Sequence, residues 1–215
     1  MDPRAVEKAK SRLRVANKAL ADMRRSETFR DFADNWYVFL TSAKNVYTVL
    51  EQGAKTTPQS RQWFGAKATI RRNDPLLQYV FEARNDDEHG LGSSIDITPE
   101  MHEIGIADEG FSKLVRLDGG PFHNVVVSGG RAGIVFKGGP PPPGLRATSL
   151  DGKPIKSKRT PATTGLVEVT ARGGRKHPPP ESHLDVPLED KSPIAVASVM
   201  VGYLASLLEE ASALA

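Results

Sequence analysis

The stretch FRDFADNWYVFLTSAKNVYTVLEQG, residues 29–53, determines the fold class of this 215-residue chain. Its apolar residues return every three or four positions, which places them on one face of an α-helix. They are Phe29, Phe32, Ala33, Trp36, Phe39, Leu40, Ala43, Val46, Tyr47 and Leu50. So many large apolar side chains on one face predict the centre of a hydrophobic core. Gly53 stands where a helix C-cap is expected.

Four further helices are predicted around this one. Residues 3–25 form an amphipathic pattern with Pro3 in its first turn, where a missing N–H costs nothing. Thr56-Thr57-Pro58 and Asn73-Asp74-Pro75 each read as a capping residue followed by a helix start. Ser192-Pro193 begins an apolar helix that must pack on other helices or across a dimer, because it is too apolar to stand alone in water.

The intervening segment has a different character. It is rich in glycine, proline and short β-branched runs, which are typical of strands joined by turns. We expect a hairpin of residues 122–128 and 133–137 around residues 129–132, and a strand over residues 165–171. Residues 138–144 and 178–180 hold proline runs typical of rigid loops or spacers. The sequence thus predicts an α+β fold: a mainly α-helical bundle of residues 1–90 and 191–215, interrupted by a small antiparallel β-rich insert at 91–190.

Composition excludes several classes of protein. The chain has no cysteine, so it can form neither disulfides nor thiolate-ligated metal sites. Its first residues lack an apolar signal segment, and the longest apolar stretch, residues 194–208, is shorter than the roughly 18 residues that span a bilayer. We therefore expect a cytoplasmic protein that does not enter a membrane.

Charge is segregated along the chain. Residues 1–72, 73–110, 111–176 and 177–215 carry net charges of +8, −9, +9 and −5. The basic blocks can attract phosphate, which permits nucleic acid as a partner. The blocks can equally neutralise one another within the folded chain or across a dimer.

The candidate for chemistry is the stretch LLQYVFEARNDDEH, residues 76–89. An apolar helical run here delivers Arg84, Asn85 and His89 to its polar end. Asn85 and His89 are four residues apart and share a helix face, whereas Arg84 lies to one side but has a long side chain. An alternative is that Arg84 forms an ion pair with Glu88 and His89 merely ends the helix.

The segment resembles the signature of the HEPN family, in which an arginine, often followed by asparagine, precedes a histidine by four to six residues. The resemblance covers the helices, residues 1–90 and 192–215, and not the insert. It implies a homodimer whose arginines and histidines share one cleft and cleave RNA without a metal or other cofactor. It also implies a role in defence, stress or a toxin-like setting, with an antitoxin-like or other protein partner.

The resemblance assigns a role to each of the three residues. His89 would act as general acid or base, since an imidazole titrates near neutral pH. Arg84 would hold the scissile phosphate, and Asn85 would orient the pair or the substrate. Asp86, Asp87 and Glu88 stand against this reading, because their charge repels phosphate. The rival function is a non-catalytic dimeric interaction module whose β insert binds a protein or ligand.

Other sites find less support in the sequence. His177 with His183, or Asp86 and Asp87 with His89, could bind a cation, but metal sites need three or four convergent ligands. His102 and His123 are expected to be structural. There is no phosphate-binding glycine loop, no Gly-x-Ser-x-Gly and no His-Glu-x-x-His. We therefore expect no cofactor and no metal.

Overall fold

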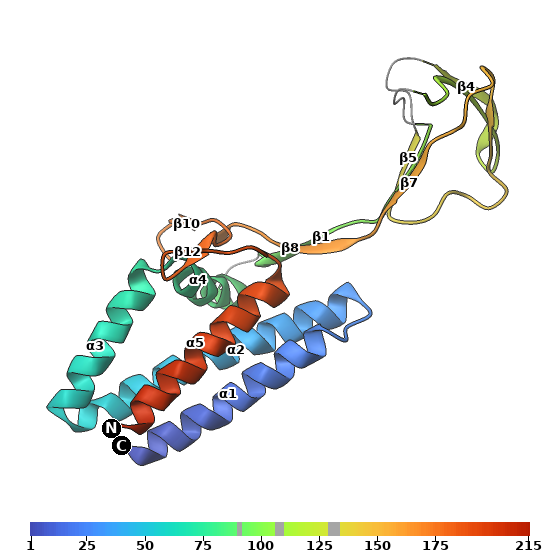
Figure 1. Ribbon diagram of the computed structural model, residues 1–215. Coiled ribbons are helices and arrows are strands. Elements are labelled where there is room, and N and C mark those ends of the chain that lie inside the picture. Colours follow the sequence, from blue (N-terminus) through green and yellow to red (C-terminus); the bar gives the residue numbers. More distant parts are fainter. Residues whose placement is uncertain (90–91, 106–109, 129–133) are drawn as a thin grey trace. The chain divides into compact units, whose positions relative to one another are not determined.

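The computed structural model of the protein describes residues 1–89, 92–105, 110–128 and 134–215, apart from the side chain of His89. It divides into two compact units (Figure 1). Unit 1 comprises Met1–Asp96 and Thr164–Ala215, and unit 2 comprises Ile97–Thr163. Every described helix lies in unit 1, and unit 2 holds small antiparallel sheets. The predicted α+β class is confirmed.

The helices begin where the capping residues predict. Thr57, Asp74 and Ser192 each accept a hydrogen bond from a backbone N–H of the first turn that follows, and a proline stands next in each case. Asp2 and Thr28 cap the two earlier helices in the same way. The helices are α1 (Pro3–Met23), α2 (Phe29–Gly53), α3 (Pro58–Asn73), α4 (Pro75–His89) and α5 (Pro193–Ser212), with a 3-10 turn η1 (Ala54–Thr56) after α2.

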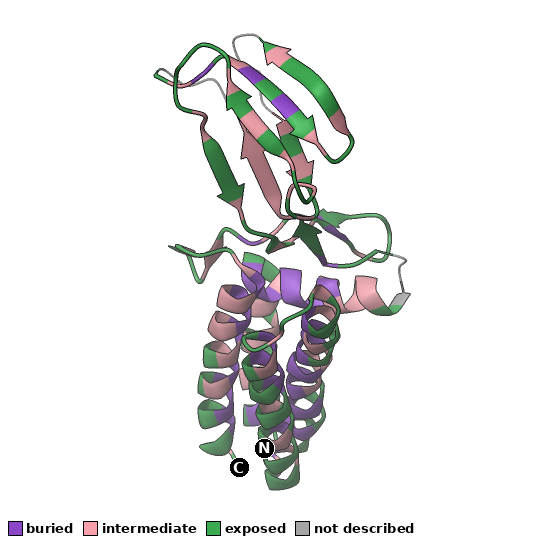
Figure 2. Ribbon diagram, turned by 90° about the vertical axis from the view of Figure 1, so that its right-hand side faces the viewer, coloured by how far each residue is buried: buried purple, intermediate pink, exposed green. Residues whose placement is uncertain are grey.

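The helix α2 forms the centre of the core of unit 1, as predicted. Trp36, Phe39, Leu40 and Leu50 are at most 1% exposed. The helices α1 and α5 pack along α2 and against each other, and their buried faces are turned inward (Figure 2). The indole N–H of Trp36 donates to the Ser94 hydroxyl at 2.9 Å, so the largest core side chain also satisfies its polar atom.

The length of the last helix, α5, differs from the expectation that its apolar stretch is too short to span a membrane. The 20 residues of α5 are long and apolar enough to do so by length and composition. In unit 1 the helix buries Val196, Met200 and Leu204 against its neighbours. Packing of this face is what the sequence predicts for a helix that is too apolar to stand alone.

Gly53 has a different role from the predicted C-cap. Its φ is −67°, an ordinary helical value, and the chain continues directly into η1. A Cβ atom at this position would lie 2.3 Å from Cβ of Ala5 in α1. Glycine is therefore required for the close approach of α1 to α2, where the Asp2 N–H also donates to the Gly53 carbonyl at 3.1 Å.

Unit 2 is built from two three-stranded antiparallel sheets, with strand orders β5-β2-β7 and β4-β3-β6. Residues 122–128 and 134–137 are strands, as expected, but they pair with β3 and β2 and belong to different sheets. The predicted hairpin between them is therefore wrong, and its turn, residues 129–132, lies outside the described residues. The strands are β2 (Met101–Ile104), β3 (Leu114–Gly119), β4 (Phe122–Ser128), β5 (Ile134–Lys137), β6 (Arg146–Ser149) and β7 (Ser157–Thr160).

The returning chain belongs mostly to unit 1. We expected the β-rich insert to run over residues 91–190, but unit 1 includes the chain from Thr164 onward, and the short strands among residues 169–183 contact α4. The hydroxyl of Tyr79 in α4 lies 3.0 and 2.7 Å from the carbonyl oxygens of Ser94 and Val167 and shares its one hydrogen between them, which anchors the leaving and returning chain to that helix. The leaving strand is β1 (Ile95–Thr98), which pairs with the returning strand β8 (Thr163–Leu166). Two short pairs follow along the chain: β9 (Val169–Thr170) with β10 (Lys176–His177), and β11 (Ser182–His183) with β12 (Val186–Pro187).

Candidate functional site

The predicted motif occupies the second half of α4, and the first half of that helix holds it in place. Leu76, Leu77 and Val80 are buried in the core of unit 1. Arg84 and Asn85 follow one to two turns later and are half-buried. The apolar start of α4 thereby fixes the motif against α2 and α3.

Asn85 lies in a cleft of about 260 Å³ lined by α2, α3 and α4, which we call the motif cleft. Its Oδ1 accepts a hydrogen bond from Lys44 Nζ at 2.6 Å, and its Nδ2 donates to Glu82 Oε2 at 3.1 Å. The side-chain amide is therefore oriented from both sides. The other residues that line the cleft are Tyr47, Thr48, Glu51, Phe64, Ala68, Arg71 and Phe81.

Three cations meet at or beside the motif cleft. Burial lowers the pKa of the Lys44 ammonium below its usual range, and the positive charge of Arg84 lowers it further. Arg71 acts in the same direction, whereas Glu88 and Glu82 partly offset the effect. Glu51 and Glu82 line the same cleft, so its cations lie among carboxylates and burial remains the main cause of the shift.

Both arginines carry donors that no described residue satisfies. The Nε atoms of Arg84 and Arg71 are buried and have no hydrogen-bond partner. The guanidinium of Arg71 lies over the ring of Phe81, with Cζ 4.0 Å from the ring centroid. Arg84 forms an ion pair with Glu88, so the pairing that their four-residue spacing predicts is confirmed. A buried donor without a partner costs free energy unless a ligand or water supplies the acceptor.

His89 is the last residue of α4, but its side chain lies outside the described residues. The helix places its backbone one turn beyond Asn85. The structure therefore places Arg84 and Asn85 near Lys44, each with an acidic partner of its own, and leaves the position of the His89 imidazole undescribed.

Two acidic residues of the motif are engaged away from Lys44. The Asp86 carboxylate accepts a hydrogen bond from the Thr170 backbone N–H at 3.0 Å. Burial raises the pKa of the Asp87 carboxyl, and a hydrogen bond from the Ser94 backbone partly opposes the effect. Both carboxyls thus connect α4 to the strands that leave and re-enter unit 1, which weakens the objection that they repel phosphate at the motif cleft.

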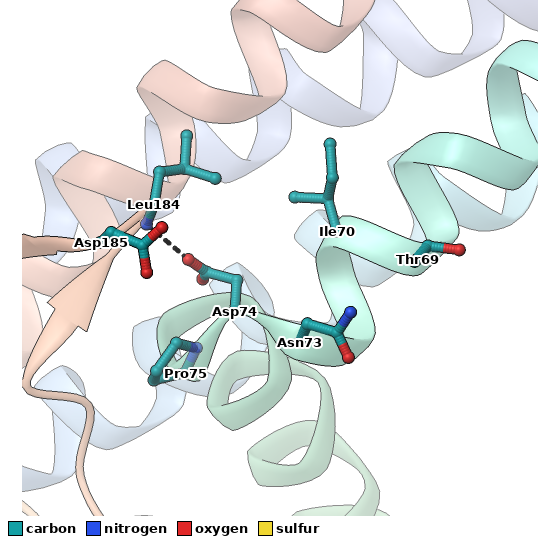
Figure 3. Close-up of a pocket in the computed structure, with 7 residues that line it drawn as sticks. All are labelled: Thr69, Ile70, Asn73, Asp74, Pro75, Leu184 and Asp185. Carbon is teal, nitrogen blue, oxygen red and sulfur yellow. Dashed lines mark hydrogen bonds between the residues drawn. The ribbon is translucent and has the colours of Figure 1, made fainter.

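A second polar centre lies at the corner between α3 and α4 (Figure 3). The buried carboxylate of Asp74 accepts hydrogen bonds from the backbone N–H groups of Leu77 at 2.8 Å and Leu184 at 2.6 Å. His183 Nδ1 lies 3.1 Å from the same carboxylate. The sequence predicts Asp74 only as a helix cap, yet Asp74 also anchors the β11–β12 hairpin. A cavity of about 250 Å³ adjoins this corner.

The remaining histidines have separate surroundings. His177 is buried in the β9–β10 pair, and His102 contacts Glu100 at 3.0 Å in unit 2. His123 is exposed. No group of three or more histidine, aspartate or glutamate side chains converges anywhere among the described residues.

Lys44 and Arg71 are the site residues that sequence reasoning missed. Neither lies in a motif, and each reaches the cleft only through helix packing. No family model, curated protein or solved structure matches this chain.

Proposed function

We propose that this protein is a HEPN-like helical bundle that binds RNA at the motif cleft and cleaves it without a metal ion. The observation that carries the proposal is the contact between Lys44 Nζ and Asn85 Oδ1 at 2.6 Å, beside two arginines with unsatisfied buried donors. A phosphate group would supply acceptors for these buried donors.

The chemistry follows from the side chains. A base removes the proton of the ribose 2′-hydroxyl, whose oxygen attacks the phosphorus and forms a 2′,3′-cyclic phosphate. The bond from phosphorus to the 5′ oxygen breaks, and an acid returns a proton to that oxygen. We assign the acid and base roles to the His89 residues of a homodimer, and stabilisation of the phosphorane charge to Arg84. Lys44 and Asn85 would position the phosphate.

The ion pair with Glu88 sets a condition on this mechanism. Arg84 must exchange the Glu88 carboxylate for a phosphate when RNA binds. Both acceptors suit a guanidinium, so the exchange keeps its charge paired.

Replacing Lys44 by methionine tests the binding step. We expect the affinity for single-stranded RNA to fall about tenfold at low salt, because one phosphate contact is lost. The slope of log affinity against log salt should become shallower by about 0.7, the contribution of one contact to a single strand. The measurement is fluorescence anisotropy of a labelled RNA.

The matched control is Lys8→Met, which removes an equal charge from the exposed face of α1. It should leave both the affinity and the salt slope nearly unchanged. Equal losses in the two variants would show that RNA responds to overall charge and not to the motif cleft.

A second candidate function is a non-catalytic interaction module. It is favoured by the pairing of Arg84 with Glu88 and of Asn85 with Lys44 and Glu82, since both motif side chains already have protein partners. This module would neither bind nor cleave RNA, so the same binding experiment separates the two functions.

A further inference from the structure

An apolar groove of about 540 Å³ lies in unit 1 between the β11–β12 hairpin and the first turns of α5. Leu184, Val186, Leu188 and Val199 line it. It is separate from the motif cleft, and the proposed function makes no use of it.

The hairpin presents its apolar side chains at a cost in backbone strain. His183 pairs with Val186, so Leu184 and Asp185 form a two-residue turn, and their φ angles are +48° and +63°. Such turns strongly favour Asn-Gly, because positive φ is unfavourable for a bulky L residue. The hydrogen bond from the Leu184 N–H to buried Asp74 holds the turn in place.

The same side chains are unusually exposed for their type. Leu184 is 50% exposed and Val186 is 65% exposed. A strained turn that leaves half of a leucine exposed gains little core packing in return. Strain of this kind is commonly retained where a segment has a binding role.

The rim of the groove is acidic. Glu189 and Asp190 line it and are exposed, and Asp185 lies in the adjoining turn. The nearby cation Lys191 is paired with Glu181, and Arg24 donates to the Ser198 hydroxyl at the groove wall. Residues 177–215 carry a net charge of −5. The groove therefore combines an apolar floor with a negative edge.

We propose that this groove binds a basic amphipathic helical segment of a partner protein. Leucine-like side chains of the segment would pack on Leu184, Val186 and Val199, and its lysines or arginines would face Glu189 and Asp190. Apolar insertion supplies affinity, and the acidic rim selects basic over acidic segments.

The test uses three labelled synthetic 16-residue peptides and the full-length protein. The first peptide has leucine at positions i, i+3, i+4 and i+7 of a lysine-rich helix. The second replaces its leucines by serine, and the third replaces its lysines by glutamate. We expect measurable affinity for the first peptide alone.

Two substitutions distinguish insertion from simple charge attraction. Val186→Asp makes the rim more negative, so pure attraction would tighten binding, whereas apolar insertion predicts a loss of about tenfold. Leu184→Asn removes an apolar contact but relieves the turn, so it should raise the thermal midpoint and still weaken binding. A variant that is more stable and binds less cannot be explained by misfolding.

Val126→Asp is the control, since Val126 belongs to unit 2, is 49% exposed and is not one of the residues that line the groove. It should bind the first peptide like the native protein. The proposal is overturned if no peptide binds, if the serine peptide binds equally well, or if Val186→Asp binds as tightly as the native protein. Concentration-dependent self-association that Val186→Asp abolishes would show that a second copy occupies the groove, which also overturns it.

Discussion

Replacing Asp74 by alanine should lower the free energy of unfolding of unit 1 by about 3–5 kcal/mol. The substitution removes the N-cap of α4, a loss of about 1 kcal/mol. It also leaves the Leu184 N–H and the His183 ring without their acceptor, at about 1–2 kcal/mol for each, since both hydrogen bonds are only partly buried. The total is a large share of the roughly 5–15 kcal/mol that stabilises a typical domain.

Urea unfolding followed by far-ultraviolet circular dichroism measures this loss, because every described helix lies in unit 1. The control is Asp34→Ala, which removes an exposed aspartate of α2 and should change stability by no more than about 0.5 kcal/mol. Similar losses in both variants would mean that the hairpin is not anchored by Asp74.

Replacing Arg84 by alanine should reduce the rate of RNA cleavage by about 10²–10³-fold, the usual effect of removing one donor that stabilises the charge of a transition state. Arg84→Lys should recover only part of the rate, because an ammonium cannot offer two parallel donors to a phosphate. Single-turnover cleavage at saturating protein measures the chemical step separately from binding.

Glu88→Gln gives the complementary result. It removes the carboxylate that pairs with Arg84, so affinity for RNA should rise while the guanidinium remains. If Arg84→Ala cleaves at the native rate, or if Glu88→Gln weakens RNA binding, Arg84 does not act on the phosphate.

The helices were predictable because their signals are local. Thr57, Asp74 and Ser192 each precede a proline at a helix start, and the apolar spacing of residues 29–53 identifies the core face without knowledge of its neighbours. The role of Gly53 was not predictable, since it depends on the approach of Ala5 from another helix.

Strand pairing and the complete site were not predictable either, because both depend on segments that are far apart in the sequence. Residues 122–128 have the composition of a strand, but that composition does not specify β3 as the partner. Arg84 and Asn85 share a recognisable motif, whereas Lys44 lies 41 residues before Asn85 and meets it only after α2 and α4 pack. His183, another partner of the Asp74 carboxylate, is 109 residues away from it in the sequence. Contacts of this kind depend on tertiary structure and leave no pattern in the local sequence.

A cleavage assay on mixed single-stranded RNA in the presence of EDTA tests directly whether this protein is a metal-independent ribonuclease. It compares the native protein with a His89→Ala variant of equal thermal stability. We expect the native protein to cleave in the chelator and to leave 2′,3′-cyclic phosphate ends, and we expect His89→Ala not to cleave. A native protein that leaves RNA intact or requires a divalent cation, or a His89→Ala variant that cleaves at the native rate, would show that the proposed mechanism is wrong.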